Sequence, residues 1–204
     1  MGSALLAGLL CIPTLVILAH LFVPMGETWN HLVNTVLVRY LSNTVLLALG
    51  VGLVGLTIGT VTAWLCAIFR FPGHGILHWA LLLPLAVPTY ATAFSYAGLC
   101  EFSGPIQTLL RESFGWSKDN YWFPEVRSIG GAVFVMAFVL YPYVYLLGRT
   151  AFVNQAKNYD EMARTLGRSP FSVFRDISLP LARPSLIAGS ALMLMETLSD
   201  FGAV

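Results

Sequence analysis

Long hydrophobic stretches without charged residues dominate this chain. Four of them exceed the ~18 apolar residues that suggest a membrane-spanning helix. They are Ala4–Val23, Thr44–Phe69, Ile76–Cys100 and Ile129–Gly148, and none contains Asp, Glu, Lys or Arg. A fifth stretch begins near Ser185 and runs to the end of the chain, with Glu196 and Asp200 inside it. The pattern predicts an all-α fold, a polytopic transmembrane bundle with about five spans.

Prolines interrupt the third and fourth of these stretches. Pro84 and Pro88 lie inside the third stretch, and Pro142 lies inside the fourth. Proline removes a backbone donor and kinks a helix, and in lipid the freed carbonyl groups need partners from neighbouring helices or from water. We therefore expect kinked helices, which favour a pore or a moving bundle over a passive anchor.

Glycines in the second stretch form a ridge of small residues. Gly50, Gly52 and Gly55 match the G-x-G-x-x-G dinucleotide fingerprint, but that motif needs a preceding strand and an acidic residue about 20 positions further on. This chain has an uncharged apolar stretch around them and Arg70 at that position. Gly55 and Gly59 instead have the spacing that lets membrane helices approach closely, so these glycines predict helix packing.

The segment between the third and fourth stretches is long and polar. Ser103-Gly104-Pro105 is a typical helix start, with proline in the first turn. An apolar stripe then follows at helical spacing, made of Ile106, Leu109, Leu110 and Phe114. Two interpretations stay open: a short helix lying on the membrane face, and a docking surface for an extracytoplasmic partner.

Composition and charge narrow the class of protein. Of the 204 residues, 57% are hydrophobic and 10% are charged, and the mean hydropathy is +0.75. A soluble domain carries about 25% charged residues, so a soluble enzyme is excluded. The formal net charge of +1 leaves no basic excess for nucleic acid. The three cysteines lie in or at the ends of apolar runs, which argues against a disulfide framework.

Basic residues between the stretches predict the orientation, because Lys and Arg favour the cytoplasmic side. With a cytoplasmic N-terminus, seven basic residues fall in cytoplasmic segments and four fall outside. The segment Arg149–Pro184 holds six of the eleven. We therefore predict a multi-pass protein of the bacterial inner membrane with its N-terminus in the cytoplasm.

Few residues suggest chemistry of their own. His74 and His78 are four apart, but glycines flank the first of them and no carboxylate lies within ten residues, so we expect an interfacial pair rather than a metal site. No P-loop pattern G-x-x-x-x-G-K-[ST] occurs in the sequence. We predict no catalytic residue, no metal site and no cofactor bound by this chain.

Glu196 and Asp200 are the carboxylates inside the fifth stretch. Being four apart, they share one helix face, and a carboxylate at that depth costs about 3 kcal/mol to insert unless it faces protein or water. One interpretation places both in a translocation pathway, where oxygen ligands suit a hard cation. The other ends the helix near Gly202, with Asp200 as an interfacial cap.

The segment after the fourth stretch predicts two short helices. The first covers Asp160–Leu166 and ends at Gly167, which supplies a left-handed residue. Ser169 and Pro170 then provide an N-cap and a proline at the first position of a second helix, which Pro180 closes. We expect Phe171 and Phe174 to be exposed. A structured loop of about 36 residues is usually functional, and here it implies a cytoplasmic partner.

This segment resembles the EAA loop of binding-protein-dependent ABC importer permeases. The pattern is E-A-A, three residues, G, nine residues, then I-x-L-P, and Met162 is the departure from it. The residues that match in register are Glu161, Ala163, Gly167, Ile177, Leu179 and Pro180. The resemblance implies that they couple the chain to an ATPase, with a coupling loop over 153–184. It also implies a permease domain over 41–204, truncated, after an N-terminal helix and periplasmic loop over 1–40.

Two further motifs resemble the ferric iron permeases within that family: Leu83–Tyr90 (LPLAVPTY) and Met195–Gly202 (METLSDFG). In that group one polypeptide often holds two homologous halves, so we expect this chain to be most of a first half. The resemblance implies a permease that moves ferric iron, and thiamine, putrescine or another small solute is the alternative.

The same resemblance implies the partners. A periplasmic binding protein delivers the substrate, cytoplasmic ATPase subunits bind ATP, and a second permease half or copy completes the pathway among membrane lipids. Two remote alternatives are a membrane-embedded enzyme and a structural membrane scaffold. The first would need clustered His or acidic ligands, and the second would not explain the register of the EAA pattern.

Overall fold

The described part of the chain is helical. The computed structural model describes residues 12–13, 15–16, 18–19, 26–117, 120–165 and 169–199, with the main chain only for 26–28 and 156–165. Within these ranges every regular element is a helix and no strand occurs, which confirms the all-α prediction. The predicted span Ala4–Val23 and the residues Gly167 and Asp200 lie wholly or largely outside the described residues.

The elements follow one another from α2 to α9. In chain order they are α2 (Gly26–Thr35), α3 (Leu37–Ile68), α4 (His74–Ala80), the 3₁₀ turn η1 (Leu83–Ala86), α5 (Thr89–Cys100), α6 (Pro105–Phe114), α7 (Ile129–Thr165), α8 (Pro170–Val173), the π-helix η2 (Phe174–Ser178) and α9 (Leu179–Ser199). The chain divides into two compact units, 1–42 and 43–204. All the sites described below lie in the second unit.

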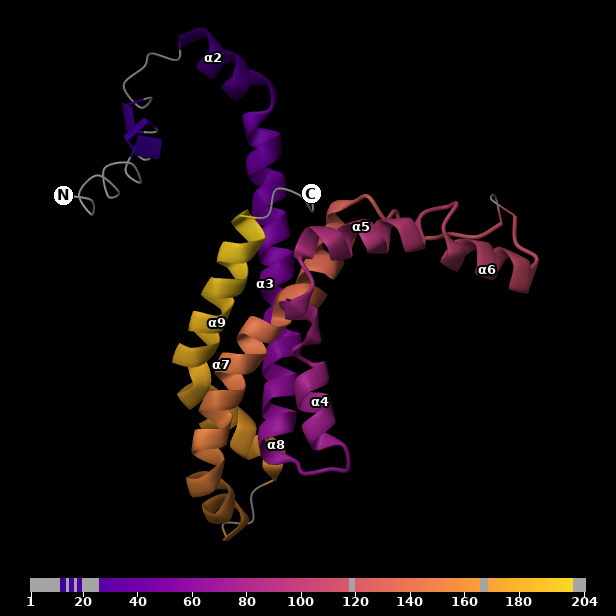
Figure 1. Ribbon diagram of the computed structural model, residues 1–204. Helices are drawn as coiled ribbons and strands as arrows, with labels where there is room; N and C mark the ends of the chain where they lie inside the picture. The colour runs from indigo at the N-terminus through magenta and orange to yellow at the C-terminus, as the bar shows by residue number, and fades with distance from the viewer. Residues whose placement is uncertain are drawn as a thin grey trace, which may run out of the picture. The chain divides into compact units, whose positions relative to one another are not determined.

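Three long helices form the core of the second unit. Within it, α3, α7 and α9 run side by side (Figure 1) and bury one apolar cluster that includes Val51, Met136, Tyr145 and Met193. Among the described residues, three helical stretches are long and apolar enough to cross a membrane. The bent pair formed by α4 to α6 would be a fourth if it is counted as one span. Five spans were expected, and the first of them is the one that falls largely on undescribed residues.

Close packing in this core depends on the glycines of α3. A Cβ added at Gly59 would lie 2.6 Å from Val144 Cβ of α7, and one added at Gly55 would collide with the Met193 sulfur of α9. Only a residue without a side chain leaves room for these neighbours. The predicted ridge of small residues is therefore confirmed as a contact surface between helices.

The third predicted span is not one helix. It is broken between α4 and α5, and the two halves, His74–Ala86 and Thr89–Phe114, are bent by 93°. Pro84 and Pro88 lie at the break. Proline lacks the backbone donor that would continue the helix, and two prolines four apart interrupt consecutive turns. The sequence predicted a kinked helix, but the bend is large enough to divide the span into two separate helical segments.

A neighbouring helix satisfies one carbonyl group that the break exposes. The Tyr141 hydroxyl of α7 donates a hydrogen bond to the Leu81 carbonyl oxygen at 2.9 Å. Leu85, which would donate to that oxygen in a regular helix, donates to Leu82 instead. The hydrogen bond from Tyr141 therefore provides the partner that a freed carbonyl group needs in lipid.

The segment after the fourth stretch differs from the prediction at both ends. The main chain of 160–165 is the last part of α7 rather than a separate helix, because no Gly or Pro interrupts residues 149–165. Pro180 does not close a helix either. It is the second residue of α9, directly after the π-helix η2, and the helix continues past it. Helical structure therefore runs without interruption over Pro170–Ser199.

Candidate functional site

The residues of the EAA pattern lie at one end of the bundle. Glu161 and Ala163 are in the helical main chain at the end of α7, while Ile177 lies near the end of η2 and Leu179 and Pro180 open α9. In Figure 1 the end of α7 and the start of α8 both lie at the lower end of the bundle. The structure thus brings both parts of the pattern to the same end of the bundle, on either side of the undescribed residues 166–168.

The start of the second helix is built as the sequence predicted. The Ser169 side chain accepts a hydrogen bond from the Ser172 backbone N–H, and Pro170 occupies the first turn. In return, the Ser172 hydroxyl donates to the Ser169 carbonyl oxygen at 2.8 Å. This N-cap fixes where α8 begins. Phe171 is 65% exposed, as expected, so an apolar ring projects from this end of the bundle.

Phe174 corrects the prediction that both phenylalanines are exposed. Its ring is partly buried, with its centroid 4.6 Å from that of Trp64 on α3 and 6.1 Å from that of Phe152 on α7. Trp64 in turn makes an edge contact with Phe69 at 5.6 Å. We call Trp64, Phe152 and Phe174 the aromatic cluster. It holds the EAA segment against two long helices at once.

This aromatic cluster was not predicted from the sequence. Trp64 and Phe152 each lie on an apolar helix, so their apolar character does not distinguish them from residues that face lipid. Their partner, Phe174, lies in a different part of the chain. A signal existed only in the position of Trp64 near the end of its hydrophobic stretch, where it could meet a segment outside the bundle.

Glu196 lines a cavity that the sequence did not predict. The cavity measures about 300 Å³ and lies where α9, α7 and the break of the third span meet. Leu85 and Pro88 contribute from the break, and Tyr143 contributes from α7. Glu196 is partly buried, and the Ser199 hydroxyl donates to its carbonyl oxygen at 3.1 Å. A carboxylate in such a confined space attracts cations and repels anions.

The two histidines have different partners and do not face a shared ligand. The His74 Nε2 atom is 2.7 Å from the Cys66 carbonyl oxygen of α3. The His78 Nδ1 atom is 2.7 Å from the Tyr145 hydroxyl of α7. The pair thus connects α4 to both neighbours. Among the described residues, no group of three or more His, Cys, Asp or Glu side chains is placed to hold a metal ion.

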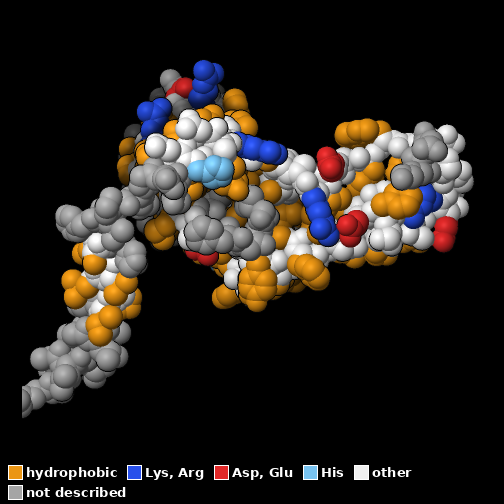
Figure 2. Space-filling view, turned by 90° about the horizontal axis from the view of Figure 1, so that it is seen from above, with side chains coloured by type: hydrophobic (Ala, Val, Ile, Leu, Met, Phe, Trp, Pro, Cys, Tyr) orange, Lys and Arg blue, Asp and Glu red, His pale blue; other side chains and the backbone are white. Residues whose placement is uncertain are grey.

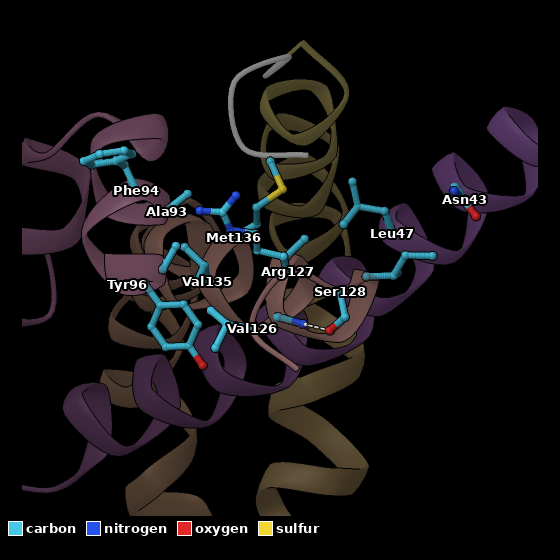
Figure 3. A pocket seen from close by; sticks show the side chains of 14 residues that line it. Asn43, Leu47, Ala93, Phe94, Tyr96, Val126, Arg127, Ser128, Val135 and Met136 are labelled. Carbon is cyan, nitrogen blue, oxygen red and sulfur yellow. Dashed lines mark hydrogen bonds between the residues drawn. The ribbon is translucent and has the colours of Figure 1, made fainter. Parts of the chain in front are cut away.

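A second cavity lies at the N-terminal end of α7 (Figure 3). It measures about 530 Å³, and most of its walls are apolar side chains of α3, α5 and α7, such as Leu47, Phe94 and Met136. Arg127 is the cationic side chain among its lining residues and forms an ion pair with Glu101 at 3.4 Å. This cavity is separate from the aromatic cluster, which lies towards the other end of α7.

Residues 5–204 match the family described as the binding-protein-dependent transport system inner membrane component. The chain belongs to this family. The EAA resemblance is therefore confirmed at the level of the family, whose members are transport components rather than enzymes. The long apolar helices of the chain, together with this family membership, indicate a multi-pass inner-membrane protein.

Curated relatives of the permease include three transport proteins. It is 30% identical over 179 residues to the sulfate transport system permease protein CysT of Salmonella typhimurium, covering 88% of this chain and 62% of the relative. It is 32% identical over 161 residues to CysW, a sulfate transport system permease protein of Escherichia coli, covering 79% and 53%. It is 32% identical over 151 residues to the molybdenum transport system permease protein ModB of the same species, covering 74% and 63%.

The chain spans between 53% and 63% of the lengths of these three relatives. Their names refer to sulfate and molybdenum, so the narrower expectation of ferric iron finds no support among them.

Proposed function

We propose that this permease is the membrane-spanning subunit of an ABC importer. It receives a substrate from a periplasmic binding protein and is driven by separate cytoplasmic ATPase subunits, with 153–184 as the coupling loop. A second permease half or copy completes the pathway. The observation that carries the proposal is Phe174, which packs the EAA segment against α3 and α7 at one end of the bundle. Neither a membrane-embedded enzyme nor a scaffold requires such an arrangement.

The geometry offers two routes from an ATPase to the spans. In the first route, an ATPase subunit that binds the exposed ring of Phe171 moves α8. Because Phe174 packs on Trp64 and Phe152, this movement also displaces α3 and α7. Along the chain, helical structure is continuous from Pro170 to Ser199, so a tilt at η2 reaches Glu196 about 33 Å away at 1.5 Å per residue. The cavity around Glu196 would then change shape with the state of the ATPase, which is a rigid-body switch biased by ATP.

For the substrate we propose an oxyanion of the sulfate or molybdate type. The support is that CysT, CysW and ModB are named for sulfate and molybdenum transport. A second candidate, ferric iron, is favoured by one observation: Glu196 places a carboxylate in the 300 Å³ cavity, where oxygen ligands suit a hard cation. In both cases we propose that this cavity belongs to the translocation pathway, together with Asp200, the next carboxylate along the sequence.

Two measurements test these proposals separately. The function predicts that the purified permease retains an ATPase subunit and that uptake into cells depends on ATP, and a permease that does neither would contradict it. The substrate is tested by uptake of ³⁵S-sulfate, ⁹⁹Mo-molybdate and ⁵⁵Fe³⁺ in cells that express the complete transporter. Uptake of iron alone would replace the oxyanion by the second candidate and leave the function standing.

A further inference from the structure

Two polar side chains of α6, Gln107 and Arg111, face the protein. Gln107 is 6% exposed, and its amide nitrogen donates to the Cys100 carbonyl oxygen at 2.7 Å. Its amide oxygen accepts a hydrogen bond from the Tyr121 hydroxyl at 2.6 Å. Arg111 donates to the Phe102 carbonyl oxygen at 2.9 Å, and its guanidinium lies 4.2 Å from the centre of the Phe102 ring. These bonds fix how α6 is rotated about its axis.

Three of the four residues of the apolar stripe of α6 consequently face outward, while Leu110 is half-buried. Leu109 and Phe114 are each 63% exposed, and Ile106 is 39% exposed. A surface helix of a water-soluble protein has the opposite arrangement, with its apolar stripe towards the core. Because the inward hydrogen bonds of Gln107 and Arg111 hold this rotation, α6 cannot hide the stripe by turning without breaking them.

The surroundings of the stripe continue its apolar character. Exposed apolar rings of α5 precede it, including Phe94, and Figure 2 shows hydrophobic side chains at the surface of the part that contains α5 and α6. Phe114 stacks on Trp116 at 4.8 Å, and Trp116 stacks on Tyr121 at 5.4 Å. Trp and Tyr gather where a membrane meets water. The stripe therefore ends beside aromatic rings of the kind that gather at a membrane interface.

We propose that α6 lies in the plane of the membrane interface, with Ile106, Leu109 and Phe114 inserted among the lipids of the extracytoplasmic leaflet. An amphipathic helix binds a membrane surface in this way without any complementary partner. A protein partner is disfavoured because a stable interface buries about 800 Å² on each side, and a ten-residue helix offers one short stripe. The inference goes beyond the proposed function and does not depend on the substrate.

Site-directed spin labelling of the full chain in lipid nanodiscs tests the proposal. Cys11, Cys66 and Cys100 are first replaced by alanine. A nitroxide is then attached to Ile106→Cys or, separately, to Leu109→Cys. Collision rates are measured with oxygen, which concentrates in lipid, and with Ni-EDDA, which stays in water. The matched control is Glu112→Cys, an exposed position on the same helix at the edge of the stripe.

We expect labels at Ile106 and Leu109 to collide more often with oxygen than with Ni-EDDA, and the label at Glu112 to show the reverse. Frequent Ni-EDDA collisions at all three positions would place the stripe in water and overturn the proposal. Protection from both reagents at Ile106 and Leu109 would mean that another protein surface covers the stripe, and this would overturn it as well. Leu109 provides the result if the Ile106 variant does not fold.

Discussion

The ring of Phe174 lies 4.6 Å from the ring of Trp64, with an angle of 41° between the two planes. Phe174 opens η2, and Trp64 lies in the last turns of α3. An aromatic pair of this kind stabilises a contact by about 0.5–1.5 kcal/mol beyond the area that it buries. The contact joins the EAA segment to α3, which is distant from it along the chain. Removing the contact should therefore affect transport differently from removing an exposed ring of the same segment.

Phe174→Ala should uncouple transport from ATP hydrolysis. Removing the ring breaks its contacts with Trp64 and Phe152 and its 6.3 Å contact with Phe171, whose own exposed ring is retained. We expect the ATPase subunit to stay bound while substrate taken up per ATP hydrolysed falls about tenfold, a coupling free energy of the usual size. The measurement is uptake and ATP hydrolysis in the same proteoliposomes.

Phe171→Ala is the matched control, since it removes the same ring from an exposed position of α8. We expect it to weaken binding of the ATPase subunit in pull-down while transport per ATP of the remaining complex stays near normal. If both variants had the same effect, Phe174 would be part of the docking surface and not a link to α3.

Gly59→Ala should destabilise the bundle. The added methyl group would lie 2.6 Å from Val144 Cβ and 3.0 Å from the Tyr141 carbonyl oxygen, and overpacking of this kind costs about 1–3 kcal/mol. Gly52→Ala on the same helix is the control, because its nearest neighbour is Leu194 Cδ2 at 3.5 Å. Thermal unfolding in detergent should show a lower Tm for Gly59→Ala only, and equal Tm values would argue against the tight contact.

Tyr141→Phe should weaken the attachment of the broken span. The variant keeps the ring but removes the hydroxyl that donates to the Leu81 carbonyl oxygen. An interhelical hydrogen bond in a membrane contributes about 1 kcal/mol, so we expect a modest loss of stability and faster proteolysis near η1. A Tm and a cleavage rate like those of the native chain would show that water replaces the hydroxyl.

Glu196→Gln distinguishes the two substrate candidates. The carboxylate lines the cavity between α9 and α7, and its charge repels a dianion and attracts a cation. We expect uptake of sulfate or molybdate to continue unslowed in this variant. Glu196→Asp retains the charge and serves as the control. Uptake that falls with Gln and persists with Asp would indicate that the transported ion is a cation.

The predicted orientation can be checked by labelling with a membrane-impermeant thiol reagent. Asn120 and Asn154 are both exposed in the structure, and the distribution of basic residues places them on opposite sides of the membrane. In a chain without its native cysteines, Asn120→Cys should react in intact cells and Asn154→Cys only after lysis. The reverse pattern would place the EAA segment outside the cytoplasm.

The sequence by itself predicted where the long helices lie, where two short helices begin and which family the chain resembles. The apolar stretches predicted α3, α7 and α9, because a helix that crosses lipid must be long, uncharged and internally hydrogen-bonded. Ser169 and Pro170 predicted where α8 begins, and Gly104 and Pro105 predicted where α6 begins, since caps depend on neighbouring residues only. The EAA pattern likewise indicated the family, because it consists of residue types at a fixed spacing along the chain.

Only the tertiary structure decided the features that depend on neighbours distant in sequence. At the 93° break the Tyr141 hydroxyl donates a hydrogen bond to the Leu81 carbonyl oxygen, and Phe174 is partly buried because its ring packs on Trp64. The cavity at Glu196 exists because the broken span leaves space against α7 and α9. In a membrane, an apolar side chain has a similar free energy whether it contacts lipid or another helix. Hydrophobicity therefore predicts which segments enter the membrane but not which helix faces pack against each other.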